Sequence, residues 1–104
     1  MVVTPSGKPH CLVLVDEVVC HAYYFSGPTP LRHGQPATGV RISADGDWDW
    51  NYAGFAPKRA ITLAYGTTYR ARGWTIEPTP EGMTFTNDAT GHGMFVSVEG
   101  VEPF

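Results

Sequence analysis

The stretch HCLVLVDEVVCH, residues 10–21, is the part of the sequence that decides the fold. It is rich in β-branched and aliphatic residues, and only Asp16 and Glu17 interrupt it. It also reads almost the same in both directions. A pattern of this kind predicts two short strands that are joined by a tight turn at residues 15–16.

The same stretch contains two cysteines and two histidines, which are the ligand types of a structural zinc site. In a hairpin that turns at residues 15–16, Cys11 faces Cys20 on one side, whereas His10 faces His21 on the other side. The spacing also differs from that of known zinc sites, so we expect no metal. A cross-strand disulfide is an alternative, but for a protein made in the cytoplasm we expect buried thiols.

The remaining sequence repeats the two-residue period in short segments, which are separated by turns rich in glycine and proline. Asp45-Gly46 is a hairpin signal, and Gly73 suggests a bulge or break within its strand. Further strands are predicted at VRIS (40–43), WDWNY (48–52), AITLAY (60–65), TYRARGWTIE (68–77), MTFT (83–86) and MFVSVE (94–99).

The fold class predicted from this pattern is all-β, with a single domain over residues 1–104. Seven or eight short strands at about ten-residue spacing are typical of a small antiparallel sandwich or barrel. A Pro/Gly-rich loop is expected at residues 26–39, lying against the surface as an ordered arm. Because chain ends are usually loose, we expect no strand after residue 99.

Charge and hydropathy exclude several classes of function. The formal net charge is −3, and the 7 basic residues are spread out, so a general nucleic-acid binder is not expected. No apolar run approaches the ~18 residues needed to insert into a membrane. The N-terminus lacks the apolar core of a signal peptide, which predicts a chain that begins in the cytoplasm. Charged residues make up only 16% of the chain, so small polar residues or another protein are expected to cover its surface.

An aromatic stripe marks the strand at residues 48–52. Trp48, Trp50 and Tyr52 alternate with polar residues and therefore share one face, and Phe55 follows shortly afterwards. A small sandwich normally turns such a face into its core, which is the first interpretation. A protein interface and a sugar-stacking platform are the alternatives, and both assign these four residues to binding.

The acidic residues of the same region resemble the start of a calcium loop, because Asp45, Asp47 and Asp49 occupy alternate positions. An EF-hand needs glycine at its sixth position and glutamate at its twelfth, where this sequence has Trp50 and Ala56. We therefore interpret the three aspartates as a solvated face.

Catalysis has little support in the sequence. His33 and His92 lie in glycine-flanked segments where a general base could be exposed, and Asp88 could orient the ring of His92. No nucleophile elbow, metal-binding helix motif or phosphate loop accompanies them. We expect no catalytic residue, no cofactor and no enzymatic activity.

The phrases DGDWDWNYAGFAPKR and GWTIEPTPEGMTFTNDATGHGMFVSVEGVEPF resemble small minor tail proteins encoded among the tail genes of actinobacterial tailed phages. The resemblance covers about the last two thirds of the chain and rests on general texture and these phrases rather than on a diagnostic motif. It implies a minor virion protein, a β-domain attached at the tail or its tip, with no catalytic residues.

The function expected from the sequence is a noncatalytic structural module that works through protein–protein contact, as a minor tail protein or other virion component. Its partners would be other virion subunits, with a homo-oligomer also possible. Exposed sheet edges and the aromatic stripe would form the contact surface. The alternatives are a carbohydrate-binding module that contacts a cell surface, and a small cytoplasmic phage effector that binds a host protein.

Overall fold

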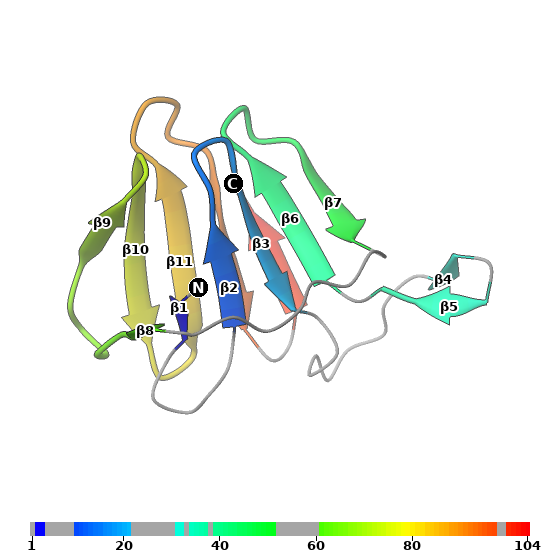
Figure 1. Cartoon of the computed structure of the whole chain (residues 1–104), viewed down its shortest axis with the longest axis horizontal. Helices are drawn as coiled ribbons and strands as arrows, with labels where there is room; N and C mark the ends of the chain where they lie inside the picture. The colour runs from blue at the N-terminus through cyan, green and yellow to red at the C-terminus, as the bar shows by residue number, and fades with distance from the viewer. Residues whose placement is uncertain are drawn as a thin grey trace.

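The computed structural model describes residues 2–3, 10–21, 31–32, 34–37, 39–51, 61–97 and 100–104, and all regular structure within them is β-strand. Two sheets face one another, as Figure 1 shows, so the predicted all-β sandwich or barrel is confirmed, in the form of a sandwich. The expected seven or eight strands are too few, because the described residues form thirteen, two of which make a separate small sheet. The strands of the first sheet are β1 (Val2–Val3), β2 (His10–Val13), β3 (Glu17–His21), β6 (Gly39–Ser43), β7 (Trp48–Asn51) and β8 (Ile61–Thr62). The strands of the second sheet are β9 (Tyr69–Ala71), β10 (Trp74–Thr79), β11 (Gly82–Asn87), β12 (Gly93–Ser97) and β13 (Gly100–Pro103).

The two sheets differ in how their strands are ordered. The five-stranded sheet is a meander in which each strand pairs antiparallel with its neighbours in sequence, in the order β13-β12-β11-β10-β9. The six-stranded sheet has the order β7-β6-β3-β2-β1-β8, and its last pair, β1 with β8, is parallel. Strand β7 therefore lies at one edge of its sheet and β8 at the other edge.

The hairpin predicted at residues 10–21 is confirmed, because Cys11 lies opposite Cys20 and Val13 lies opposite Val18. The expectation of buried thiols is wrong: both cysteines are fully buried, but they are joined by a disulfide. The hydrogen bond from the Leu14 N–H to the Glu17 carbonyl (2.8 Å) makes residues 14 and 17 a hydrogen-bonded pair. Hydrogen-bonded and non-hydrogen-bonded pairs alternate along an antiparallel ladder. This alternation leaves the two cysteines in a non-hydrogen-bonded pair, where opposite side chains approach most closely.

The core lies between the sheets and is built mainly from alternate residues of β2, β3, β6, β10, β11 and β12, as the two-residue period predicts. Trp74 is its largest fully buried side chain, and its indole Nε1 donates to the Leu14 carbonyl across the interface between the sheets (3.0 Å). The buried cluster consists of Cys11, Val13, Val18, Cys20, Val40, Ile42, Leu63, Trp74, Ile76, Met83, Phe85, Met94 and Val96.

The break that Gly73 suggested within residues 68–77 is confirmed, because Arg72 and Gly73 both have positive φ angles and make a tight turn between β9 and β10. Two segments differ from the sequence-based expectations. The expected loop at 26–39 contains a short two-stranded sheet of β4 (Leu31–Arg32) and β5 (Gln35–Pro36). The last residues are not loose, since β13 pairs with β12 and Phe104 exchanges two backbone hydrogen bonds with Gly93.

Candidate interaction surface at strand β7

Strand β7 carries the aromatic stripe at the edge of the six-stranded sheet. Trp48 lies opposite Ile42 and Trp50 lies opposite Val40 in the antiparallel ladder. Residues that lie opposite one another point to the same face, and both β6 partners are fully buried. The two indoles therefore point to the side of the sheet that faces the core.

The two tryptophans differ in how far the core covers them. Trp50 is half-buried and packs against the buried cluster. Trp48 is 39% exposed, although it faces the same way. The ring centroids are 5.7 Å apart, and the rings meet edge to face at 72°. Within one stripe, Trp50 thus packs against the core, whereas Trp48 is more exposed at the surface.

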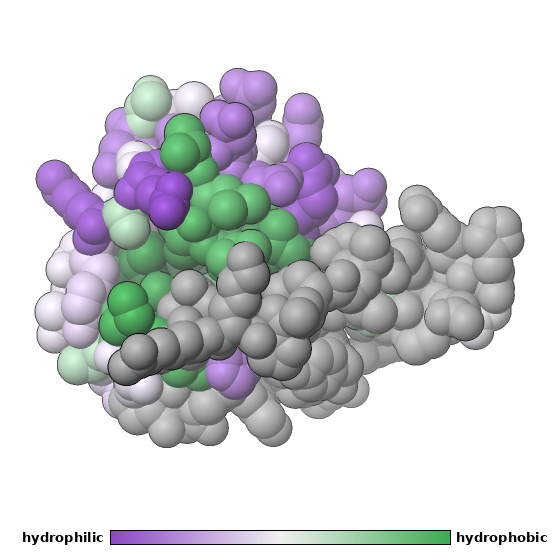
Figure 2. All heavy atoms as spheres, in the orientation of Figure 1, coloured by the Kyte–Doolittle hydropathy of each residue, from purple (hydrophilic) through white to green (hydrophobic). Residues whose placement is uncertain are grey.

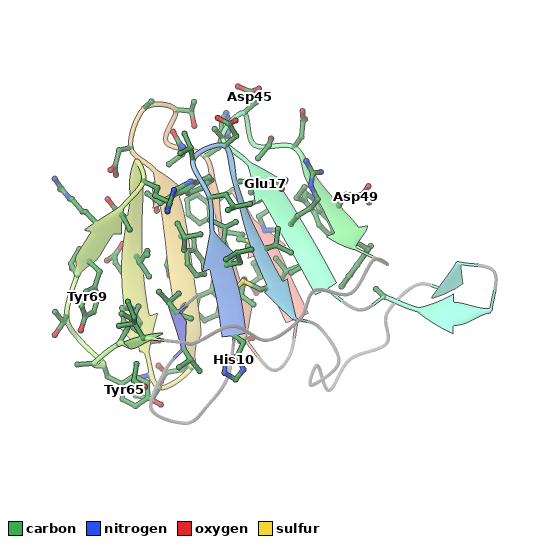
Figure 3. All side chains as sticks on the ribbon, viewed as in Figure 1. His10, Glu17, Asp45, Asp49, Tyr65 and Tyr69 are labelled. Atoms are coloured by element: carbon green, nitrogen blue, oxygen red, sulfur yellow. A yellow bond between two sulfur atoms is a disulfide. The ribbon has the colours of Figure 1, made fainter. Side chains whose placement is uncertain are left out.

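The opposite face of β7 carries Asp49, which is exposed and lies across from Arg41. Its carboxylate Oδ1 accepts a hydrogen bond from the backbone N–H of Trp50 (2.8 Å). The guanidinium of Arg41 pairs instead with Glu17 of β3 (2.9 Å). Figure 3 labels Glu17 and Asp49 on their strands. A charge on an edge strand discourages pairing with another strand, so contact through the side chains is the favoured use of this edge.

Tyr52 and Phe55, which the sequence analysis assigned to the same surface, lie outside the described residues. The described part of the candidate surface is therefore Trp48 with its neighbour Trp50. We refer to it below as the Trp48 surface.

Asp88, which the sequence analysis considered as a residue that could orient the ring of His92, has another partner. The Asp88 carboxylate accepts a hydrogen bond from the Thr75 hydroxyl. The ring of His92 lies against Gly46, where an added Cβ would come within 2.7 Å of the ring carbon Cγ. His33 lies outside the described residues.

The potential metal ligands have other roles or lie apart. The sulfur atoms of Cys11 and Cys20 are bonded to one another, so they are not available as thiolate ligands. Asp45 and Asp47 lie in the β6–β7 turn, and the turn at Asp45-Gly46 is the hairpin turn predicted from the sequence. Among the described residues, no three His, Cys, Asp or Glu side chains form a group that could hold a metal ion.

A pocket of about 220 Å³ lies along β12 and β13. It is lined by Phe95, Ser97, Gly100, Val101 and Glu102. This lining offers one carboxylate and one hydroxyl beside an aromatic ring.

Two exposed aliphatic residues lie at the tip of the β2–β3 turn, where the sequence analysis placed Val15 in the turn but Leu14 still in the strand. Leu14 is 36% exposed and Val15 is 61% exposed. The end of β2 at Val13 cannot be seen in the sequence, because the apolar run LVLV continues into the turn. The turn geometry alone makes Val13 buried and the next two residues exposed. Turns usually contain Gly, Asn or Pro, so aliphatic residues in a turn were the signal that could have identified this exposed apolar tip.

Comparison with known proteins gives no family model that matches the sequence, and neither a curated protein nor a solved structure is similar to it. Within the residues that the structure describes, there is also no helix long and apolar enough to cross a membrane. The surface of the chain itself is therefore the basis for proposing a function.

Proposed function

We propose that this chain is a noncatalytic interaction module that other proteins hold through the Trp48 surface. The observation that carries the proposal is a tryptophan that is 39% exposed at a sheet edge, beside a second, half-buried tryptophan that packs against the buried cluster. A large aromatic side chain held in one position loses little entropy on binding, which is why tryptophan is prominent among residues that dominate interface energies.

The geometry of the two rings favours a protein contact over a sugar-binding platform. Rings at 72° to one another do not form a shared flat surface. An edge-to-face pair instead presents one ring face and one ring edge, which suits the irregular packing of a protein interface.

We propose further that the module is a component of a virion, as a minor tail protein or a similar subunit. The resemblance stated in the sequence analysis motivates this location, and the observation that supports it is the buried disulfide between Cys11 and Cys20. Disulfides persist on virion surfaces and outside cells, and they are rare in the reducing cytoplasm. The disulfide therefore favours a virion component over an effector that acts inside the host cell.

Complementation with tagged variants tests both parts of the proposal. Particles are produced with the wild-type chain, with Trp48→Ala, or with Ile61→Ala, and the incorporated chain is quantified by mass spectrometry. Ile61 is the matched control, because it is 66% exposed at the opposite edge of the same sheet. We expect the wild type and Ile61→Ala to be incorporated equally, and Trp48→Ala to fall about tenfold or more.

The possible failures are distinguishable. Trp48→Ala at wild-type levels would show that the Trp48 surface is not the contact. A wild-type chain that is absent from purified particles would show that the location is wrong. Thermal unfolding of all three chains is the folding control. Ile61→Ala should change stability by no more than about 0.5 kcal/mol. Trp48→Ala also loses the edge-to-face contact with Trp50, which is worth about 0.5–1.5 kcal/mol, so this chain is assayed at a temperature where it is folded.

A further inference from the structure

One end of the sandwich gathers four turns, which we call the loop end. Figure 1 shows these turns side by side at the top of the view, away from β8. They join β2 to β3, β6 to β7, β9 to β10, and β11 to β12. Their residues are 14–16, 44–47, 72–73 and 88–92.

The turns of the loop end are bonded to one another. The Ala44 N–H donates to the Asp16 carbonyl (2.8 Å), and the Thr90 hydroxyl donates to the Ala44 carbonyl. The Asp88 N–H donates to the Gly73 carbonyl (2.9 Å). Four turns held in one arrangement form a surface that loses little conformational entropy when a partner binds.

Leu14 and Val15 form an apolar projection on this surface. The Leu14 carbonyl is fixed by the buried indole of Trp74, so the turn cannot simply fold inwards to hide the two side chains. Figure 2 shows hydrophobic side chains gathered over the front sheet and reaching towards this end, with hydrophilic side chains on both sides. Single exposed apolar residues are common, but two adjacent ones that continue a larger apolar face mark a contact site.

The charges around the projection are mostly of one sign. The charged side chains of the four turns are Arg72 and four exposed aspartates. Glu17 adds little to this balance, because Arg41 neutralises it. The aspartates are Asp16, Asp45, Asp47 and Asp88. An acidic rim repels the phosphates of nucleic acids and anionic lipids and attracts a basic protein surface.

We propose that the loop end binds a basic protein segment, in which an apolar side chain packs on Leu14 and Val15 while lysines or arginines pair with the surrounding aspartates. The loop end and the Trp48 surface consist of different residues. The proposal for the loop end also specifies the chemistry of its partner. A central apolar contact within a charged rim is the usual anatomy of a specific protein interface.

Selection from a library of random linear peptides tests the proposal. The library is selected on the wild-type chain, and the enriched peptides are then tested on Val15→Ser, which removes an apolar contact and should weaken their binding. We expect the enriched peptides to combine lysine or arginine with an aliphatic or aromatic residue. Their affinity should weaken as salt is raised, because salt screens attraction between exposed charges.

Two charge variants provide the matched comparison. Asp16→Asn/Asp45→Asn/Asp47→Asn removes three charges from the loop end and should weaken the selected peptides about tenfold or more. The control removes three exposed carboxylates elsewhere, at Glu77, Glu81 and Glu102, each replaced by glutamine. It should change the affinity less than about twofold.

Several results would overturn the proposal. They are a lack of any enriched peptide, enrichment without basic residues, binding that survives Val15→Ser, and equal losses in the two charge variants. The Trp48→Ala chain separates this surface from the proposed function, because it should bind the selected peptides as the wild type does. Thermal unfolding of each variant verifies that it is folded.

Discussion

Gly46 is the residue on which the packing of two turns depends most directly. Its φ is +89°, a backbone conformation that residues other than glycine rarely adopt. An added Cβ would also lie 2.7 Å from Cγ and 2.8 Å from Nδ1 of His92. The position therefore combines backbone strain with a steric clash.

Gly66 is the matched control for Gly46, with φ of +77° and nothing within 4 Å of an added Cβ. We expect Gly66→Ala to lower the free energy of unfolding by about 1 kcal/mol, from backbone strain alone. Gly46→Ala should cost roughly a further 1–3 kcal/mol, because the His92 ring must shift. The double variant Gly46→Ala/His92→Ala should recover most of that difference. Urea unfolding measures all three, and equal costs for Gly46→Ala and Gly66→Ala would contradict the packing.

The tryptophans show how far a single residue type can be interpreted from sequence. Alternation predicts that Trp48 and Trp50 share a face, and the register with Ile42 and Val40 confirms it. It cannot predict that one is half-buried and the other 39% exposed. That difference depends on which parts of the fold pack over each ring, which the two-residue period does not specify.

Among the elements, the β2–β3 hairpin is the one with a covalent constraint. The disulfide joins residues that are 9 positions apart, with Cα atoms at 4.1 Å. A short closed loop restricts the unfolded chain, and the fully buried sulfur atoms add to the core. The hairpin is therefore expected to depend on the redox state of its surroundings.

Reduction should lower the free energy of unfolding by roughly 2–4 kcal/mol, because the unfolded chain regains conformational freedom. Urea unfolding with and without a phosphine reductant measures the change. The double variant Cys11→Ala/Cys20→Ala is the control, and its transition should not respond to reductant. An unchanged wild-type midpoint after reduction, verified by thiol labelling of the unfolded chain, would contradict the expectation.

Two elements show how little the local sequence says about strand pairing. Gly73 suggested a bulge or a break, but the Arg72-Gly73 turn lacks the Asn-Gly or Asp-Gly pair that usually signals a hairpin, so the sequence does not distinguish the two. Strand β13 contains a glycine and a proline, which are depleted in strands, and it exists because β12 offers its edge. Both elements depend on pairing rather than on local preference.

At the scale of the whole molecule, both sheets contribute to the same buried cluster. Val18, Val40 and Ile42 come from the six-stranded sheet, and Trp74 and Phe85 come from the five-stranded sheet. Neither sheet can bury its apolar face without the other. The sandwich should therefore unfold as one cooperative unit.

Coincident transitions by two probes would verify this cooperativity. Far-UV circular dichroism reports both sheets, while in Trp74→Phe the remaining tryptophan fluorescence comes only from Trp48 and Trp50 of the six-stranded sheet. We expect the two probes to give the same urea midpoint in that variant, although at lower urea than in the wild type. Separate midpoints would show that the sheets unfold independently.

The sequence by itself determined the fold class, the β2–β3 hairpin with its facing cysteines, and the Asp45-Gly46 turn, because these follow from local periodicity and turn chemistry. Only the tertiary structure decided that β1 pairs parallel with β8, that Trp48 is exposed at an edge, and that four distant turns meet at one end. These features depend on which strands become neighbours across long stretches of chain. A two-residue period fixes the face of each side chain but carries no information about the strand that will lie beside it.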